Sequence, residues 1–198
     1  VDLAHFGLPH EPTPGEVLNQ GADVVTFSGD KLLGGIQAGV IVGSGELIDK
    51  IKENPLKRAL RADKITLAIL DATLKTYEDP DSVRKKIPLL QTLTLPRKTL
   101  GHRGKVLAKL LKDRLDGFTI EIVDSKTQIG SGALPDRLID SLAIKISHTK
   151  TGEMRELASK LRDLSPPVIG RVQDDSLMLD LRGAEPMEEL TRTLGNLT

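Results

Sequence analysis

The segment DVVTFSGDKLLGG, residues 23–35, holds the residues with the clearest potential for chemistry. Its β-branched run predicts a short buried strand that ends just before Lys31 and the glycine pair Gly34–Gly35. If the fold keeps this lysine semi-buried, burial lowers the pKa of its amine. A neutral amine can form a Schiff base with the aldehyde of pyridoxal phosphate (PLP). The glycines would let the backbone approach a flat cofactor, and Ser28 could bind its phosphate. The alternative is a surface lysine in a β-turn that Ser28 caps.

A second candidate site is the arginine pair Arg58 and Arg61 in PLKRALRADK. Apolar residues recur at spacings of three and four from Pro55 to Tyr77, which predicts one long helix. On such a helix the i, i+3 spacing places both guanidinium groups on one face. Two fixed cations side by side suit a phosphate-like or carboxylate anion. The alternative is a solvated basic face.

Composition narrows the remaining classes of function. The chain has 28 Lys+Arg and 28 Asp+Glu, so it lacks the strongly basic balance typical of many nucleic-acid-binding proteins. Aromatic residues make up 2%, too few for a surface that stacks bases, and the absence of cysteine excludes disulfides and thiolate sites. The four histidines lack metal-ligand spacing, so no metal site is expected. The basic stretch 97–103 and the lysine-rich helix after it could contact RNA phosphates, but the pattern favours a solvated helix face.

The pattern of elements predicts two domains, residues 1–79 and 80–198. The first has the character of the end of an α/β sheet of mostly parallel strands. Its expected elements are a strand remnant at residues 1–3, a helix opened by Thr13-Pro14, and buried strands at 23–27 and 38–42.

The second domain is expected to be a small α+β unit with an antiparallel sheet, because its strands alternate apolar and polar residues. The expected elements are strands near 118–123 and 140–147, a loop at 130–135, a helix at 153–164, a hairpin around Asp174–Asp175 and a last helix near Pro186. No apolar stretch approaches the roughly 20 residues of a membrane span, and no signal peptide is predicted.

Four blocks of this sequence resemble, in order, the bacterial selenocysteine synthases, which are L-seryl-tRNA(Sec) selenium transferases. The blocks are VDLAHFGLPHEPT, GADVVTFSGDKLLGGIQAGVIVG, NPLKRALRADKITLAILDATL and PPVIGRVQDDSLMLDLR. One departure is Ile36, where the family usually has proline. The likeness covers essentially the whole chain and only the C-terminal part of such an enzyme. Together with the lack of an initiator methionine, this suggests a fragment of something longer.

The resemblance implies a PLP-dependent enzyme of the aminotransferase-like fold (fold type I), whose PLP-binding lysine is matched by Lys31. Arg58 and Arg61 match arginines that the family uses for an anionic group of the selenium donor or intermediate. The implied reaction converts seryl-tRNA(Sec) to selenocysteinyl-tRNA(Sec) with selenophosphate, in a cytoplasmic homo-oligomer. The partner of the pyridine nitrogen, which is not assigned to Asp2, and the tRNA-binding domain are expected outside this chain. The isolated chain is therefore expected to be inactive.

Two alternatives remain open at this stage. A related PLP-dependent lyase, acting on a small amino or sugar acid without tRNA, would share the lysine region. A structural fragment or oligomerisation module would have no catalysis of its own. Bound PLP and the length of the purified protein would discriminate between them.

Overall fold

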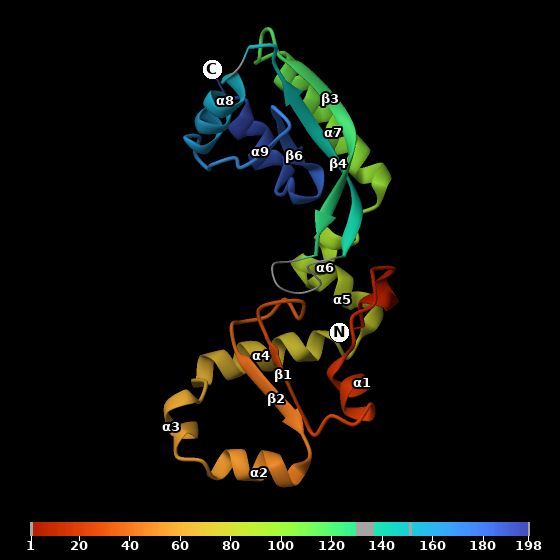
Figure 1. Cartoon of the computed structure of the whole chain (residues 1–198), viewed down its shortest axis with the longest axis vertical. Helices are drawn as coiled ribbons and strands as arrows, with labels where there is room; N and C mark the ends of the chain where they lie inside the picture. The colour runs from red at the N-terminus through yellow and green to blue at the C-terminus, as the bar shows by residue number, and fades with distance from the viewer. Residues whose placement is uncertain (1, 130–136, 151, 198) are drawn as a thin grey trace. The chain divides into compact units, whose positions relative to one another are not determined.

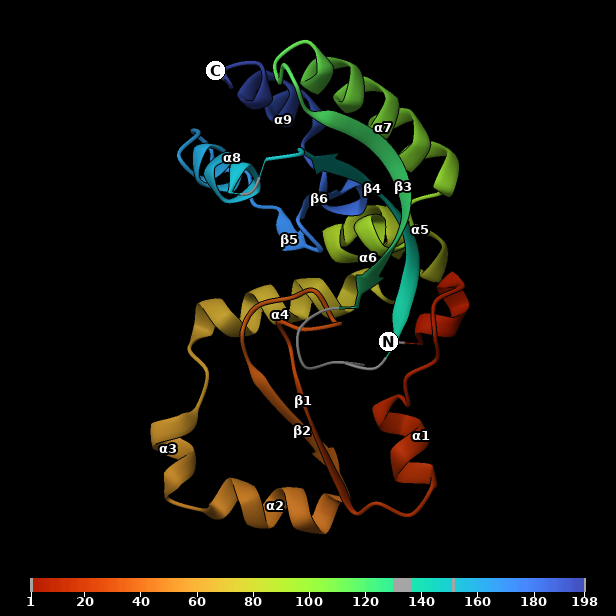
Figure 2. The same cartoon turned by 45° about the horizontal axis from the view of Figure 1, so that its top comes forward.

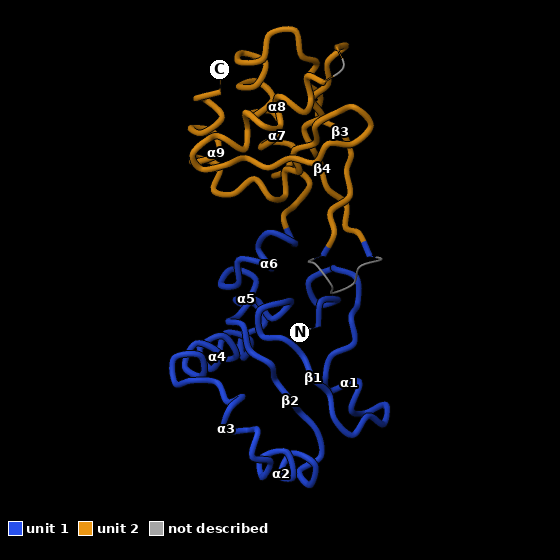
Figure 3. The backbone as a smooth tube through the Cα atoms, turned by 60° about the vertical axis from the view of Figure 1, so that its left-hand side comes forward, with its two compact units in different colours: residues 1–94, 129–137 blue, residues 95–128, 138–198 orange. Residues whose placement is uncertain are grey.

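The computed structural model describes residues 2–129, 137–150 and 152–197 of the chain (Figure 1 and, from a second direction, Figure 2). Two compact units divide it: unit 1 is Val1–Thr94 with Ile129–Arg137, and unit 2 is Leu95–Gln128 with Leu138–Thr198 (Figure 3). Unit 1 thus extends past residue 79, where the sequence placed a domain boundary. The loop expected at residues 130–135 lies outside the described residues.

Unit 1 is built mainly from short helices around one pair of strands. In chain order they are η1 (Leu3–Phe6), α1 (Pro14–Asn19), β1 (Val24–Ser28), β2 (Gly39–Gly43), α2 (Gly45–Glu53), α3 (Leu56–Leu60), α4 (Lys64–Thr76), α5 (Pro80–Lys86) and α6 (Pro88–Leu93). Helix α1 begins as predicted, because Thr13 and Glu16 form a capping box ahead of Pro14. Helix α1 lies against β1 (Figure 1).

The strands β1 and β2 pair antiparallel, from Val24 opposite Gly43 to Ser28 opposite Gly39. This corrects the expectation of a mostly parallel sheet in this part of the chain. The reason is the length of the connection, because a parallel pair needs a crossover of about a dozen residues or more. Residues 29–38 supply fewer than that, so the chain turns back beside β1.

The first residues form a 3-10 helix where a strand remnant was expected. The Asp2 side chain accepts a hydrogen bond from the Ala4 amide at 3.0 Å, which caps η1 at its first turn. Gly7 ends η1 in the left-handed conformation, with φ of +73°. These local bonds satisfy backbone groups that a strand would have to pair with a neighbour.

The long helix expected from Pro55 to Tyr77 is two helices, α3 and α4. Arg61 has an extended backbone (φ −65°, ψ 138°) and ends α3. Asp63 then starts α4, because its carboxylate accepts hydrogen bonds from the amides of Ile65 at 2.7 Å and Thr66 at 2.9 Å. The apolar spacing continues across this break, so periodicity alone did not reveal it.

A small apolar core holds unit 1 together. Its fully buried members are Leu3, Val83, Ile87 and Leu90, and partly buried side chains pack against them, including Leu32 and Tyr77. The core therefore joins η1, the loop after β1, the end of α4 and the helices α5 and α6.

Unit 2 is an antiparallel sheet with three helices. Its elements are α7 (Arg97–Lys112), β3 (Thr119–Gln128), β4 (Leu138–Ser147), α8 (Glu153–Arg162), β5 (Arg171–Gln173), β6 (Ser176–Asp180), η2 (Leu181–Gly183) and α9 (Met187–Leu194). The strand order is β3-β4-β6-β5, and every pair is antiparallel, which confirms the expected antiparallel sheet. The predicted hairpin is β5–β6, whose turn residues Asp174 and Asp175 both have positive φ.

The core of unit 2 lies between one face of the sheet and the helices. Ile144 and Ile146 of β4 are fully buried there, together with Leu107 of α7 and Leu161 of α8. Alternation of inward and outward side chains along β4 places them on the same face. Within the part of the chain that is described, no helix is long and apolar enough to cross a membrane.

Candidate functional site

The loop that follows β1 carries Lys31 on a tightly bonded turn. The Gly34 amide donates to the Lys31 carbonyl at 2.9 Å, and Gly34 adopts φ of +67°, which favours glycine. On either side, the Gly35 amide donates to the Gly29 carbonyl and the Gly29 amide to the Ala38 carbonyl, both at 2.8 Å. The backbone around Lys31 is therefore fixed at both ends of the turn.

The glycine pair is required by packing within the protein. A Cβ atom at Gly34 would lie 2.6 Å from Cγ2 of Ile87, and one at Gly35 would lie 3.0 Å from Cγ2 of Thr73. From the sequence, these glycines were expected to allow close approach of a flat cofactor. In unit 1 the close approach is made by α4 and by Ile87, the residue between α5 and α6.

Tyr77 holds the Lys31 turn from the side of α4. Its hydroxyl donates a hydrogen bond of 2.7 Å to the carbonyl of Leu33, a residue that is 8% exposed. A buried carbonyl needs a donor, and this bond supplies it across 44 residues of sequence. Burial raises the pKa of the Tyr77 phenol to about 12, so the hydroxyl remains a donor at neutral pH.

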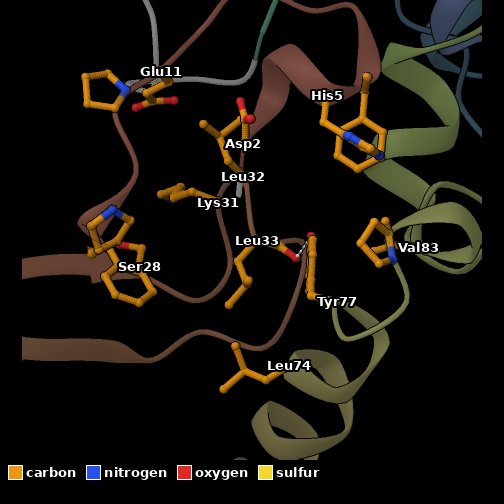
Figure 4. Close-up of a pocket in the computed structure, with 15 residues that line it drawn as sticks. Asp2, His5, Glu11, Ser28, Lys31, Leu32, Leu33, Leu74, Tyr77 and Val83 are labelled. Carbon is orange, nitrogen blue, oxygen red and sulfur yellow. Dashed lines mark hydrogen bonds between the residues drawn. The ribbon is translucent and has the colours of Figure 1, made fainter. Parts of the chain in front are cut away.

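Lys31 lines a cavity of about 670 Å³ in unit 1 (Figure 4). Ligand sites of small molecules are of this size, with mostly apolar walls and a few polar groups. The polar side chains here come from η1, the segment before α1, the end of β1, the turn and the end of α4: Asp2, His5, Glu11, Ser28, Lys31 and Tyr77. The apolar walls include Phe6, Phe27, Leu32, Leu33, Leu74 and Val83.

Lys31 is more exposed than the sequence analysis expected. Its side chain is 54% accessible, and its Nζ lies 3.6 Å from Oδ2 of Asp30, so the amine forms a long, exposed ion pair. Such pairs contribute little to stability. The expectation of a semi-buried lysine is therefore wrong for this chain by itself, because Lys31 sits on a turn at the surface of unit 1.

Ser28 and Lys31, two predicted site residues, line the same cavity. The Ser28 hydroxyl makes no hydrogen bond with the described residues, so it is available to an anion. Glu11 was not predicted, although its Oε2 is buried and has no hydrogen-bond partner in the described part of the chain. The Asp2 carboxylate, by contrast, is occupied in capping η1.

The structure does not bring Arg58 and Arg61 to this cavity. Arg58 lies in α3 and Arg61 caps its end, so the two no longer share the face of one continuous helix as predicted. Both are exposed. Helix α4 follows them, and its 13 residues span about 20 Å before the cavity residue Tyr77. The arginines are therefore remote from Lys31 within one copy of the chain.

Sequence reasoning missed Tyr77, His5 and Glu11 as residues of the site. Tyr77 carried one signal, because it is the single tyrosine of the chain and stands at the end of a predicted helix. No group of three or more His, Asp or Glu side chains with metal-binding geometry occurs among residues 2–129, 137–150 and 152–197.

Comparison with known proteins assigns this chain to a protein family. The family model described as L-seryl-tRNA selenium transferase matches residues 1–185. The chain belongs to the L-seryl-tRNA selenium transferase family. Among curated relatives named L-seryl-tRNA(Sec) selenium transferase, the Haemophilus influenzae (Rd) protein is 45% identical over 198 residues, all of this chain. Those of Escherichia fergusonii and Rhizobium meliloti are 47% and 45% identical over 93% and 98% of the chain.

The chain spans less than half the length of these transferases. The alignments cover 43%, 41% and 42% of the Haemophilus, Escherichia and Rhizobium proteins. The family assignment extends over both units, since its matched residues run from η1 through η2 and include the Lys31 turn.

Proposed function

We propose that this chain is the C-terminal part of a PLP-dependent L-seryl-tRNA(Sec) selenium transferase of fold type I. The complete enzyme would convert seryl-tRNA(Sec) to selenocysteinyl-tRNA(Sec) with selenophosphate, in the cytoplasm. The observation that carries the proposal is Lys31, an amine on a rigid turn that lines a cavity in a chain of this family. Residues 1–79 would complete the PLP-binding domain, and residues 80–198 would form the small domain.

The residues of the cavity fit PLP in part. Its volume and apolar walls suit a flat aromatic ring, Lys31 supplies the amine, and Ser28 supplies one free hydroxyl for the phosphate. When bound, PLP acts as an electron sink that stabilises a carbanion at the amino-acid α-carbon. One hydroxyl is too little for a dianionic phosphate, so the phosphate would need further donors besides the described side chains of this cavity.

Lys31 has two tasks under this proposal. Its Nζ would hold the cofactor through the aldehyde group. As a free amine beside the substrate, it would carry the α-proton. The bonds from Tyr77 to Leu33 and from Gly34 to Lys31 hold the backbone of the turn that carries this amine.

We further propose that Arg58 and Arg61 bind the anionic selenium donor at the cavity of a second copy. Helix α4, about 20 Å long, lies between them and the cavity residue Tyr77 of their own copy, and an exposed guanidinium group suits a small anion. This arrangement requires a homo-oligomer, because each site would take its lysine from one copy and its arginines from another.

Borohydride reduction of the complete PLP-loaded enzyme tests the role of Lys31. Reduction should fix the cofactor to the peptide that contains Lys31, and Lys31→Ala should remove both the adduct and turnover. Lys50→Ala is a matched control, since Lys50 is an exposed lysine paired with Glu46 at 2.7 Å outside the cavity.

Three other outcomes would contradict the proposal. An adduct on another lysine would overturn the assignment of Lys31. An adduct on Lys31 with elimination from a free amino or sugar acid, and none from seryl-tRNA, would indicate the related lyase. Absence of any adduct in the complete protein would indicate a structural role.

A further inference from the structure

Helix α7 differs in charge from the other long helices of the protein. Its 16 residues, RKTLGHRGKVLAKLLK, include six Lys or Arg and no Asp or Glu. Every other described helix of eight or more residues, which are α2, α4, α8 and α9, carries at least one acidic side chain. The zero net charge of the whole chain therefore conceals a strongly basic local segment.

Most of the basic side chains of α7 lie in one row. At about 100° per residue, the row falls within an arc of roughly 80° and extends for about 21 Å along the helix. We call it the α7 stripe, and its members are Lys98, His102, Lys105, Lys109 and Lys112. Helix α7 packs against β3 and β4 (Figure 2). Its buried leucines lie on the side of the helix opposite the α7 stripe, so the helical spacing places the stripe away from these strands.

The lysines of the α7 stripe are exposed, and none of them forms an ion pair with any described residue. The two arginines of α7 behave differently, since Arg97 pairs with Asp124 and Arg103 with Glu185. The acid nearest in sequence, Asp113, follows the helix and is not paired with the stripe. The positive charges of the four stripe lysines are thus left without a counter-charge among the described residues.

Helix stability accounts for only part of this row, since the helix dipole favours cations in the last turn, where Lys109 and Lys112 lie. Like charges at i, i+4 destabilise a helix by a few tenths of a kcal/mol per pair, and Lys105 and Lys109 are such a pair. Lys98 also lies in the first turn, where the helix dipole disfavours a cation. Helices α8 and α9 follow the favourable order, with acidic residues in the first turn and basic residues in the last. A solvated face needs only that mixed pattern.

We propose that the α7 stripe binds the phosphate backbone of RNA, and this inference rests on the proposed tRNA substrate. A row of ammonium groups about 21 Å long can neutralise several successive phosphates. Helix α7 has no Phe, Tyr or Trp on which a base could stack, and four of the five residues of the stripe are lysines, so the contact is to the backbone.

A pair of matched variants of the complete enzyme tests the α7 stripe. The stripe variant changes Lys98, Lys105, Lys109 and Lys112 to Gln. The control variant changes four lysines that are each paired with an acidic side chain, Lys50, Lys52, Lys75 and Lys160, to Gln, with the same loss of charge. Binding of a tRNA(Sec) transcript is measured by fluorescence anisotropy over a range of salt concentrations, and thermal unfolding checks the fold.

The stripe variant should bind the transcript about tenfold or more weakly at 0.1 M salt. Its slope of log affinity against log salt should fall by about 0.7–0.9 for each lysine that contacts a phosphate. The control variant should keep the wild-type slope. The stripe variant should also unfold at the same or a higher temperature, because repulsion along α7 is relieved.

Each other result has a definite meaning. If the stripe variant binds the transcript with the same affinity and the same salt slope as the wild type, the proposal that the α7 stripe binds RNA is wrong. The proposed function would be unaffected by this result. An equal loss in the control would show a general charge effect and overturn it too. If the stripe variant loses binding to anionic lipid vesicles and keeps tRNA binding, the partner is a membrane surface. If the wild-type enzyme does not bind the transcript, both the RNA-binding proposal and the proposed function are wrong.

Discussion

Lys31 and Tyr77 are linked through a single carbonyl group, that of Leu33. The phenol donates to this carbonyl, and the carbonyl lies two residues after the lysine. A side chain at the end of α4 therefore controls the backbone that carries the amine. The neutral form of the phenol makes this bond, and burial favours that form.

The first prediction concerns Tyr77→Phe, which leaves the buried Leu33 carbonyl without a donor. The free energy of unfolding should fall by about 1–3 kcal/mol at pH 7. Because the folded pKa of about 12 lies above the ordinary pKa of a tyrosine, 10.0, the contribution of the phenol is complete below pH 10 and is lost as pH rises toward 12. The difference in the free energy of unfolding between wild type and variant, measured by urea unfolding, should therefore decrease from pH 10 to pH 12.

Thr94→Val provides a control for this measurement. It also removes one hydroxyl bond to a backbone carbonyl of unit 1, that from Thr94 to Leu90 at 2.6 Å. Its effect on the free energy of unfolding should stay constant between pH 10 and 12. If the effect of Tyr77→Phe on the free energy of unfolding also stays constant between pH 10 and 12, the proposed role of the phenol is wrong.

At the scale of elements, the break between α3 and α4 decides where the arginines point. Asp63 creates the break, since its carboxylate caps α4. Hydrogen bonds from the Thr66 amide and hydroxyl hold the pKa of Asp63 below its ordinary value. The cap is therefore a charged group whose strength depends on pH.

The second prediction follows from this cap. Because the folded pKa of Asp63 is lowered, its stabilisation is present above the unfolded value of about 3.8 and is lost as pH falls through the folded pKa. Asp63→Asn keeps a capping oxygen that does not titrate. Urea unfolding between pH 5 and 2 should be less acid-sensitive for Asp63→Asn than for wild type. Identical acid sensitivity would indicate that the cap is not used in solution.

Local sequence signals predicted many of the elements. The β-branched runs gave β1 and β2 within a residue, and Thr13-Pro14 gave the start of α1, because these signals act over a few residues. The antiparallel pairing of β1 with β2 and the break at Asp63 were missed. The short connection after β1 decided the first, and the cap at Asp63 decided the second. Neither is visible in the spacing of apolar residues.

The candidate site was predictable only in part, for a related reason. Lys31 and Ser28 stand close together in sequence and could be recognised there. The bond from Tyr77 spans 44 residues, and the cavity also takes residues from η1 and the segment before α1. Contacts of this kind depend on the packing of the whole unit, which no local pattern encodes.

At the scale of the whole molecule, the separation of Lys31 from Arg58 and Arg61 gives a third prediction. Two inactive variants of the complete enzyme, Lys31→Ala and Arg58→Lys with Arg61→Lys, should restore activity when their copies are mixed in one oligomer. In a randomly paired dimer about a quarter of the sites would be intact. Turnover with selenophosphate is measured after co-expression and compared with each variant alone.

A mixture without activity would contradict the shared site. The Arg→Lys exchange is suited to this test because an ammonium keeps the charge and loses the fork of donors that a guanidinium offers. Borohydride trapping in the arginine variant should remain normal, which separates donor binding from cofactor binding.

The bond between Tyr77 and Leu33 also has an optical consequence. The chain has one tyrosine and no tryptophan, so nearly all of its near-ultraviolet fluorescence originates from the phenol on the wall of the cavity. A chromophore that enters the cavity would quench this emission by energy transfer, and an opening of the turn would change its intensity. The chain thus contains an intrinsic fluorophore at its candidate site, and occupancy can be followed without a label.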